Sequence, residues 1–124
     1  MSSPFWITGA LLGASSVAFG AFGAHGLKSR GIEVSKITSF QTAAHYQLIH
    51  SLALLVAEQA APKNVWAKSF FTAGIAMFSG SIYLLVLDGQ RFKALGPVTP
   101  VGGVFLMAGW LALAFGTRGR IALR

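Results

Sequence analysis

The segment from residue 4 to residue 24 reads PFWITGALLGASSVAFGAFGA and contains no charged residue. Its length matches the roughly 20 apolar residues that a helix needs to cross about 30 Å of hydrocarbon. Small residues recur in it at alternating spacings of four and three, at Gly9, Gly13, Ser16, Gly20 and Gly23. Small side chains along one face let membrane helices approach closely, so the segment predicts a spanning helix with a packing stripe.

The rest of the chain continues this pattern. Hydrophobic residues make up 54% of the chain and charged residues only 10%, which is too apolar for an ordinary soluble domain. The sequence therefore predicts an all-α membrane protein with a single domain, residues 1–124. We expect four transmembrane helices joined by short connections, at about residues 4–25, 37–59, 65–88 and 99–117. The first helix lacks the basic start of a signal peptide and is long for one, so we expect it to be retained.

Small residues also mark the third and fourth segments. The expected packing positions there are Ala76, Gly80, Gly102, Gly109, Ala112 and Gly116. A mean spacing of about 3.5 residues keeps a stripe facing its neighbour along a left-handed crossing. We therefore predict a left-handed four-helix bundle.

Capping residues mark several helix ends. Ser3-Pro4, Asn64-Val65 and Thr99-Pro100 each pair a good N-cap residue with a suitable first helical residue. Gly26 and Gly89 stand where C-terminal caps are expected. These signals agree with the boundaries inferred from the uncharged stretches.

The second segment differs from the others because it carries several polar side chains. Tyr46, Gln47 and His50 share one broad helical face, and His50 lies about 20 Å from the helix start, near the bilayer midplane. Polar groups at that depth are costly unless paired, so we expect them to point into the bundle and to join Tyr83 and nearby hydroxyl groups. The candidate buried polar cluster consists of His25, Tyr46, Gln47, His50, Ser79 and Tyr83.

Histidine leaves several chemical roles open. A buried imidazole can relay protons near neutral pH, or it can bind zinc or haem iron. A haem needs two histidines that face each other across helices, and His25 with His45 is the best pair for that role. The simplest interpretation is that the histidines are hydrogen-bonded and fix the register of the helices. We therefore predict no cofactor and no metal site.

Recognisable catalytic motifs are missing from the sequence. The chain has no cysteine, and its three acids, Glu33, Glu58 and Asp88, fall at segment ends or in a loop. No zinc-protease, hydrolase or phosphate-loop motif occurs. The sequence therefore predicts that the protein is not an enzyme.

The net charge of +7 resides in the short connections. Lys and Arg there meet lipid headgroups, whereas nucleic-acid binding needs a basic face on a soluble domain. We expect the lipid bilayer as a partner and no nucleic acid. Five basic residues fall on each side of the predicted spans, so the positive-inside rule gives no orientation.

Four strings along the chain resemble a known family. They are Gly20–Leu27 (GAFGAHGL), Tyr46-Gln47 followed by His50, Phe78–Tyr83 (FSGSIY) and Thr99–Gly103 (TPVGG). In this order they resemble the domain of unknown function 423 family, which includes YgdD-like bacterial proteins and the transmembrane protein 256 group. The characteristic positions are His25, Tyr46, Gln47, His50, Ser79, Gly80, Ser81, Tyr83, Thr99, Pro100, Gly102 and Gly103.

The resemblance covers essentially the full chain. It implies four membrane helices and a multi-pass location, in the plasma membrane of a bacterium or the mitochondrial inner membrane of a eukaryote. It brings no established activity, substrate or cofactor. His45 is not one of the characteristic positions, which weakens the haem interpretation.

Two functions are compatible with these patterns. The first is a non-enzymatic accessory or assembly component of a membrane protein complex, which binds a membrane-protein partner or a second copy through its small-residue surfaces. The alternative is a small transporter or proton-handling protein whose pathway is lined by Tyr46, His50 and Tyr83.

Overall fold

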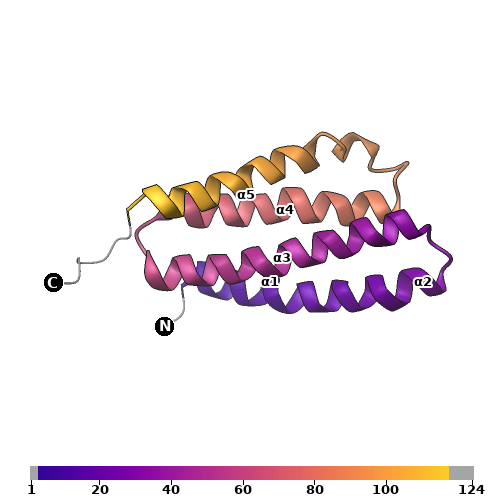
Figure 1. Ribbon diagram of the computed structural model, residues 1–124, viewed down its shortest axis with the longest axis horizontal. Helices are drawn as coiled ribbons and strands as arrows, with labels where there is room; N and C mark the ends of the chain where they lie inside the picture. The colour runs from indigo at the N-terminus through magenta and orange to yellow at the C-terminus, as the bar shows by residue number, and fades with distance from the viewer. Residues whose placement is uncertain (1–2, 118–124) are drawn as a thin grey trace.

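The computed structural model describes residues 3–117, which form four long helices and no strand. The helices run up and down side by side, and α1 begins at the same end of the molecule at which α5 finishes (Figure 1). Their bounds are Pro4–Ala21 for α1, Val34–Ala60 for α3, Val65–Leu87 for α4 and Val98–Phe115 for α5. The predicted all-α architecture is confirmed. Arg118, Arg120 and Arg124, which entered the charge count above, lie outside the described residues.

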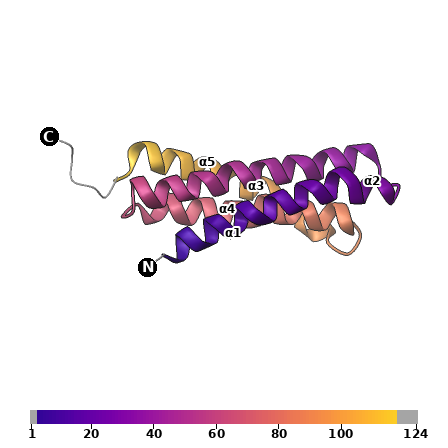
Figure 2. The same cartoon turned by 90° about the horizontal axis from the view of Figure 1, so that it is seen from below.

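Three helical stretches are long and apolar enough to cross a membrane: Pro4–Ser29, Val65–Leu87 and Lys93–Phe115. The remaining long helix, α3, has 27 residues but holds the polar side chains, which lower its hydropathy. It packs against both α1 and α4 and lies between them in the view of Figure 1. Figure 2 shows the same helices from below, all running along the length of the molecule. We expect α3 to be the fourth spanning helix; that expectation and the left-handed crossing remain predictions.

The first helix is longer than predicted. Gly26 is not its C-cap, because the helix continues through a π-helical turn, Phe22–Gly26, into a short helix α2, Leu27–Ser29. The chain reverses at Gly31, whose φ of 71° lies in the left-handed region that glycine adopts at little cost.

The expected N-caps hold at two helices and fail at the third. The Ser3 hydroxyl accepts a hydrogen bond from the Trp6 N–H at 3.1 Å, and Asn64 caps α4 in the same way. Thr99 is not an N-cap, because α5 begins at Val98, two residues before the expected first helical residue Pro100, and its N-cap residue is Pro97. The Pro97 ring holds φ at −68°, which suits a helix start, and the Thr99 hydroxyl bonds to Ser81 of α4 instead.

Glycines let the first helical stretch, Pro4–Ser29, approach α3 and let α5 approach α4. A Cβ placed on Gly23 would lie 2.9 Å from the Phe40 ring of α3, and one on Gly109 would lie 2.6 Å from the Phe71 ring of α4. A Cβ on Gly102 would overlap the backbone of α4 itself. The helices are thus arranged in the order α1, α3, α4, α5, with only a small direct contact between α1 and α4.

Candidate functional site

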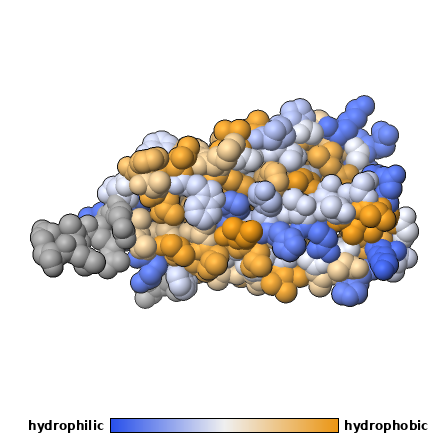
Figure 3. All heavy atoms as spheres, viewed as in Figure 1, coloured by the Kyte–Doolittle hydropathy of each residue, from blue (hydrophilic) through white to orange (hydrophobic). Residues whose placement is uncertain are grey.

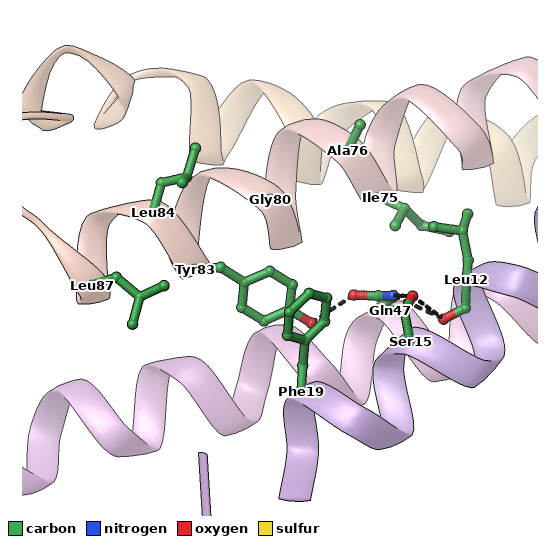
Figure 4. Close-up of a pocket in the computed structure, with 10 residues that line it drawn as sticks. All are labelled: Leu12, Ser15, Phe19, Gln47, Ile75, Ala76, Gly80, Tyr83, Leu84 and Leu87. Atoms are coloured by element: carbon green, nitrogen blue, oxygen red, sulfur yellow. Dashed lines mark hydrogen bonds between the residues drawn. The ribbon is translucent and has the colours of Figure 1, made fainter. Parts of the chain in front are cut away.

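The Gln47 side chain ties three helices together (Figure 4). Its Nε2 donates to the Leu12 carbonyl oxygen at 2.8 Å and to the Ser15 hydroxyl at 2.7 Å, both on α1. Its Oε1 accepts a hydrogen bond from the Tyr83 hydroxyl of α4 at 2.6 Å. We call Leu12, Ser15, Gln47 and Tyr83 the Gln47 network. Both amide hydrogens and the amide oxygen of Gln47 are thereby used inside the protein.

His50 belongs to a separate site that links α3 to α5. Its Nε2 lies 2.9 Å from the indole nitrogen of Trp110, and its Nδ1 lies 2.7 Å from the Tyr46 carbonyl oxygen. An indole N–H can only donate, so Nε2 is the acceptor and the ring proton sits on Nδ1. The imidazole is therefore neutral, with both nitrogens engaged. A metal or a second proton must displace Trp110 to reach it.

Two of the predicted cluster residues are not buried. Tyr46 is 44% exposed, with its ring stacked on His50 at a centroid distance of 5.7 Å. His25 is exposed, and its Nδ1 contacts the Ala21 carbonyl oxygen of its own helix at 3.1 Å. The reason is rotational: Gly23 and Leu27 face the core, and His25 lies two residues, or about 200°, from each. The expected inclusion of both residues in a buried cluster is thus corrected.

The two remaining candidates, Ser79 and His45, differ in burial: Ser79 is buried and His45 is not. The Ser79 hydroxyl donates to the Ala43 carbonyl oxygen at 2.7 Å, which joins α4 to α3. His45, which was considered with His25 as a haem ligand, is exposed as well. Among residues 3–117, no group of three or more His, Asp or Glu side chains is placed to hold a metal ion.

Sequence reasoning missed two partner groups, Trp110, which is 44% exposed, and Lys68, which is buried. The signal for Trp110 was a tryptophan well inside a span, away from the membrane interfaces where tryptophan is enriched. Lys68 is 5% exposed and forms an ion pair with Glu58 at 2.8 Å. The signal for that pair was opposite charges near the two ends of one short connection. Within the described part of the chain, every buried side-chain nitrogen or oxygen has a hydrogen-bond partner.

A groove of about 390 Å³ opens between α1 and α4, beside the Gln47 network (Figure 4). We call it the α1–α4 groove. Phe19 of α1 and Leu84 of α4 form part of its apolar walls, and Ala76 and Gly80 form a smooth strip on α4. A Cβ placed on Gly80 would meet no atom within 4 Å, so the strip is open. Its volume is in the range of small ligand sites, but the polar groups that line it already bond to one another.

Comparison with known sequences gives a consistent answer. The family model described as a protein of unknown function (DUF423) matches residues 19–103. A UPF0382 membrane protein of Staphylococcus aureus is 44% identical over 91% of this chain and 93% of its own length. A UPF0382 membrane protein of Schizosaccharomyces pombe is 36% identical over 87% and 96%, respectively.

The UPF0382 inner membrane protein YgdD of Escherichia coli is 39% identical over 94% of this chain and 91% of its own length. No solved structure matches the chain. The family resemblance inferred from the four sequence strings is confirmed. With its four helices, three of them apolar enough to span a bilayer, the chain is an integral membrane protein that belongs to the DUF423 family of unknown function.

Proposed function

We propose that the protein is a non-enzymatic accessory or assembly component of a membrane protein complex, and that its α1–α4 groove receives a transmembrane helix of the partner. The observation that carries this proposal is the open strip at Ala76 and Gly80. Ala76 is exposed, and the position of a Cβ on Gly80 is empty. Small residues on a membrane helix let another backbone approach closely, which is the main source of helix association in lipid.

The other small-residue positions support this choice by contrast. Gly23 and Gly109 are already covered by phenylalanine rings of neighbouring helices within the chain. The strip at Ala76 and Gly80 has the same character without a cover of this kind. Apolar walls at Phe19 and Leu84 give an incoming helix side chains to pack against.

The hydrogen bonds of Tyr83, which lines the groove, and of His50, which lies outside it, favour helix binding over transport. The Tyr83 hydroxyl is held by Gln47, and the His50 ring is held by Trp110. Among residues 3–117 these hydrogen bonds do not connect Tyr83 to His50, as a proton path through both residues would require. The transporter alternative therefore has less support, and proton flux into liposomes, compared with a His50→Leu variant, is its direct test.

Site-specific photo-crosslinking in native membranes tests the proposal. A photoreactive residue is placed at Ala76 in the groove or, as a control, at Leu111, which is 59% exposed on α5. We expect a discrete adduct with another membrane protein from position 76 and none from position 111. Equal diffuse labelling from both positions would contradict the proposal. An adduct at twice the mass of the chain would show that the partner is a second copy of this chain.

A further inference from the structure

A second cavity, of about 380 Å³, lies at the other side of α4 and does not involve the α1–α4 groove. It is formed where α3 begins, α4 ends and α5 begins. We call it the interfacial cavity. Its lining residues are Lys36, Ser39, Ile82, Leu85, Val86 and Thr99.

The lining is polar at one end and apolar at the other. Lys36 lies in the first turn of α3 and Thr99 in the first turn of α5, so both stand at the ends of their helices. Ile82 lies one turn deeper in α4 than Val86. The cavity therefore leads from the expected headgroup level towards the hydrocarbon region.

Lys36 supplies a cation with no partner of its own. Within residues 3–117 its ammonium group makes no hydrogen bond and no ion pair, in contrast to Lys68, which is bound to Glu58. The hydroxyl groups of the cavity are already used, since Ser39 donates to the Ser35 carbonyl oxygen and Thr99 bonds to Ser81. Lys36 is thus the group that can recognise a ligand.

The surroundings of Lys36 are positively charged. Counting Lys36 itself, five basic residues lie in the two connections at this end of the molecule or next to them, against the two acids Glu33 and Asp88. Hydrophilic side chains gather at the same end in the surface view (Figure 3). The basic residues are Lys28, Arg30, Lys36, Arg91 and Lys93. Basic pockets between transmembrane helices bind anionic lipid headgroups.

We propose that the interfacial cavity binds one anionic phospholipid. Its phosphate lies beside the Lys36 ammonium group, and one acyl chain follows Leu85 and Ile82 into the membrane. The basic end of the molecule favours a lipid with net negative charge over a zwitterionic one. The inference is independent of what occupies the α1–α4 groove.

Native mass spectrometry of the delipidated protein tests the site. The protein is titrated with phosphatidylglycerol or phosphatidylcholine, and the variant Lys36→Gln is compared with Lys28→Gln, an exposed lysine at the same end outside the cavity. We expect wild type to prefer phosphatidylglycerol. Lys36→Gln should lower the affinity about fivefold, the effect of one near-surface cation, and Lys28→Gln much less.

A second variant separates shape from charge. Ile82→Trp fills the deep end of the cavity and should also lower phosphatidylglycerol binding, although Lys36 is retained. Equal losses from the two lysine variants would overturn the proposal in favour of diffuse attraction. Full competition by millimolar inorganic phosphate would likewise overturn it, because the site would then recognise a free anion instead of a lipid.

Discussion

Replacing Gln47 by leucine is the sharpest perturbation of the buried polar network. Leucine has a similar size but removes three hydrogen bonds, to the Leu12 carbonyl oxygen, the Ser15 hydroxyl and the Tyr83 hydroxyl. Hydrogen bonds between membrane helices contribute about 0.6 kcal/mol on average. The Ser15 hydroxyl keeps its own bond to Leu12, at 3.2 Å, but the buried Tyr83 hydroxyl loses its acceptor. An unsatisfied buried group costs about 1–3 kcal/mol, so we expect a total loss of about 2–4 kcal/mol.

The assay is reversible unfolding in mixed micelles, followed by circular dichroism, within a double-mutant cycle. Tyr83→Phe alone removes one bond and should cost about 1 kcal/mol. The double variant should cost less than the sum of the single variants, because the two side chains bond directly to each other. Gln41→Leu is the matched control, since Gln41 makes one longer bond, to the Gly20 carbonyl oxygen at 3.2 Å.

The reasoning would be refuted by two results. A Gln47→Leu variant as stable as the Gln41→Leu control would show that the network does not hold the three helices together. Strictly additive effects in the cycle would show that Gln47 and Tyr83 do not interact. Either result would reopen the possibility that these side chains serve a ligand or a proton instead of the fold.

Three further predictions concern other contacts. Gly102→Ala should cost about 1–3 kcal/mol in detergent unfolding, because its Cβ would overlap the α4 backbone. Gly103→Ala should be nearly neutral, because a Cβ there would lie 3.7 Å from its nearest neighbour, a ring carbon of Phe78; equal effects of the two substitutions would contradict the packing. Trp110→Phe removes the hydrogen bond to His50 and should cost about 0.6–1.7 kcal/mol of unfolding free energy. It should also shift the ¹⁵N resonance of His50 Nε2, and an unchanged resonance would disprove the bond. Lys68→Met should cost about 2 kcal/mol at pH 7, because it leaves the Glu58 carboxylate unpaired. The cost is smaller than for a fully buried pair, since the Glu58 side chain is 17% exposed. An unchanged thermal unfolding midpoint would show that the ion pair adds no stability.

The helices could be predicted from the sequence because a spanning helix needs only an uncharged stretch of sufficient length. Their ends were less certain, since local signals compete with tertiary contacts. Thr99 looked like an N-cap, but its hydroxyl found Ser81 on a neighbouring helix. Gly26 looked like a C-cap, but a glycine also fits within a π-helical turn.

The polar partners could be predicted only in part. Helical periodicity placed Gln47 and His50 on one face and led to the expectation that both point into the bundle, where the structure buries them. Periodicity does not say which face of α5 turns toward α3, or which α5 residue lies at the depth of His50. The bond between His50 and Trp110, 60 residues away, could therefore not be inferred. The same limit explains His25, whose orientation depends on which face of α1 meets α3.

The central claim, that the α1–α4 groove receives a partner helix, is tested most directly by filling it. Gly80→Leu places a bulky side chain in open space, so the isolated protein should unfold at the same denaturant concentration as wild type. Ala114→Leu, at an exposed position of α5 outside the groove, is the control. In native gels of mildly solubilised membranes, Gly80→Leu should release the protein from its complex while Ala114→Leu leaves the complex intact. A Gly80→Leu variant that remains in a complex of wild-type size would contradict the claim.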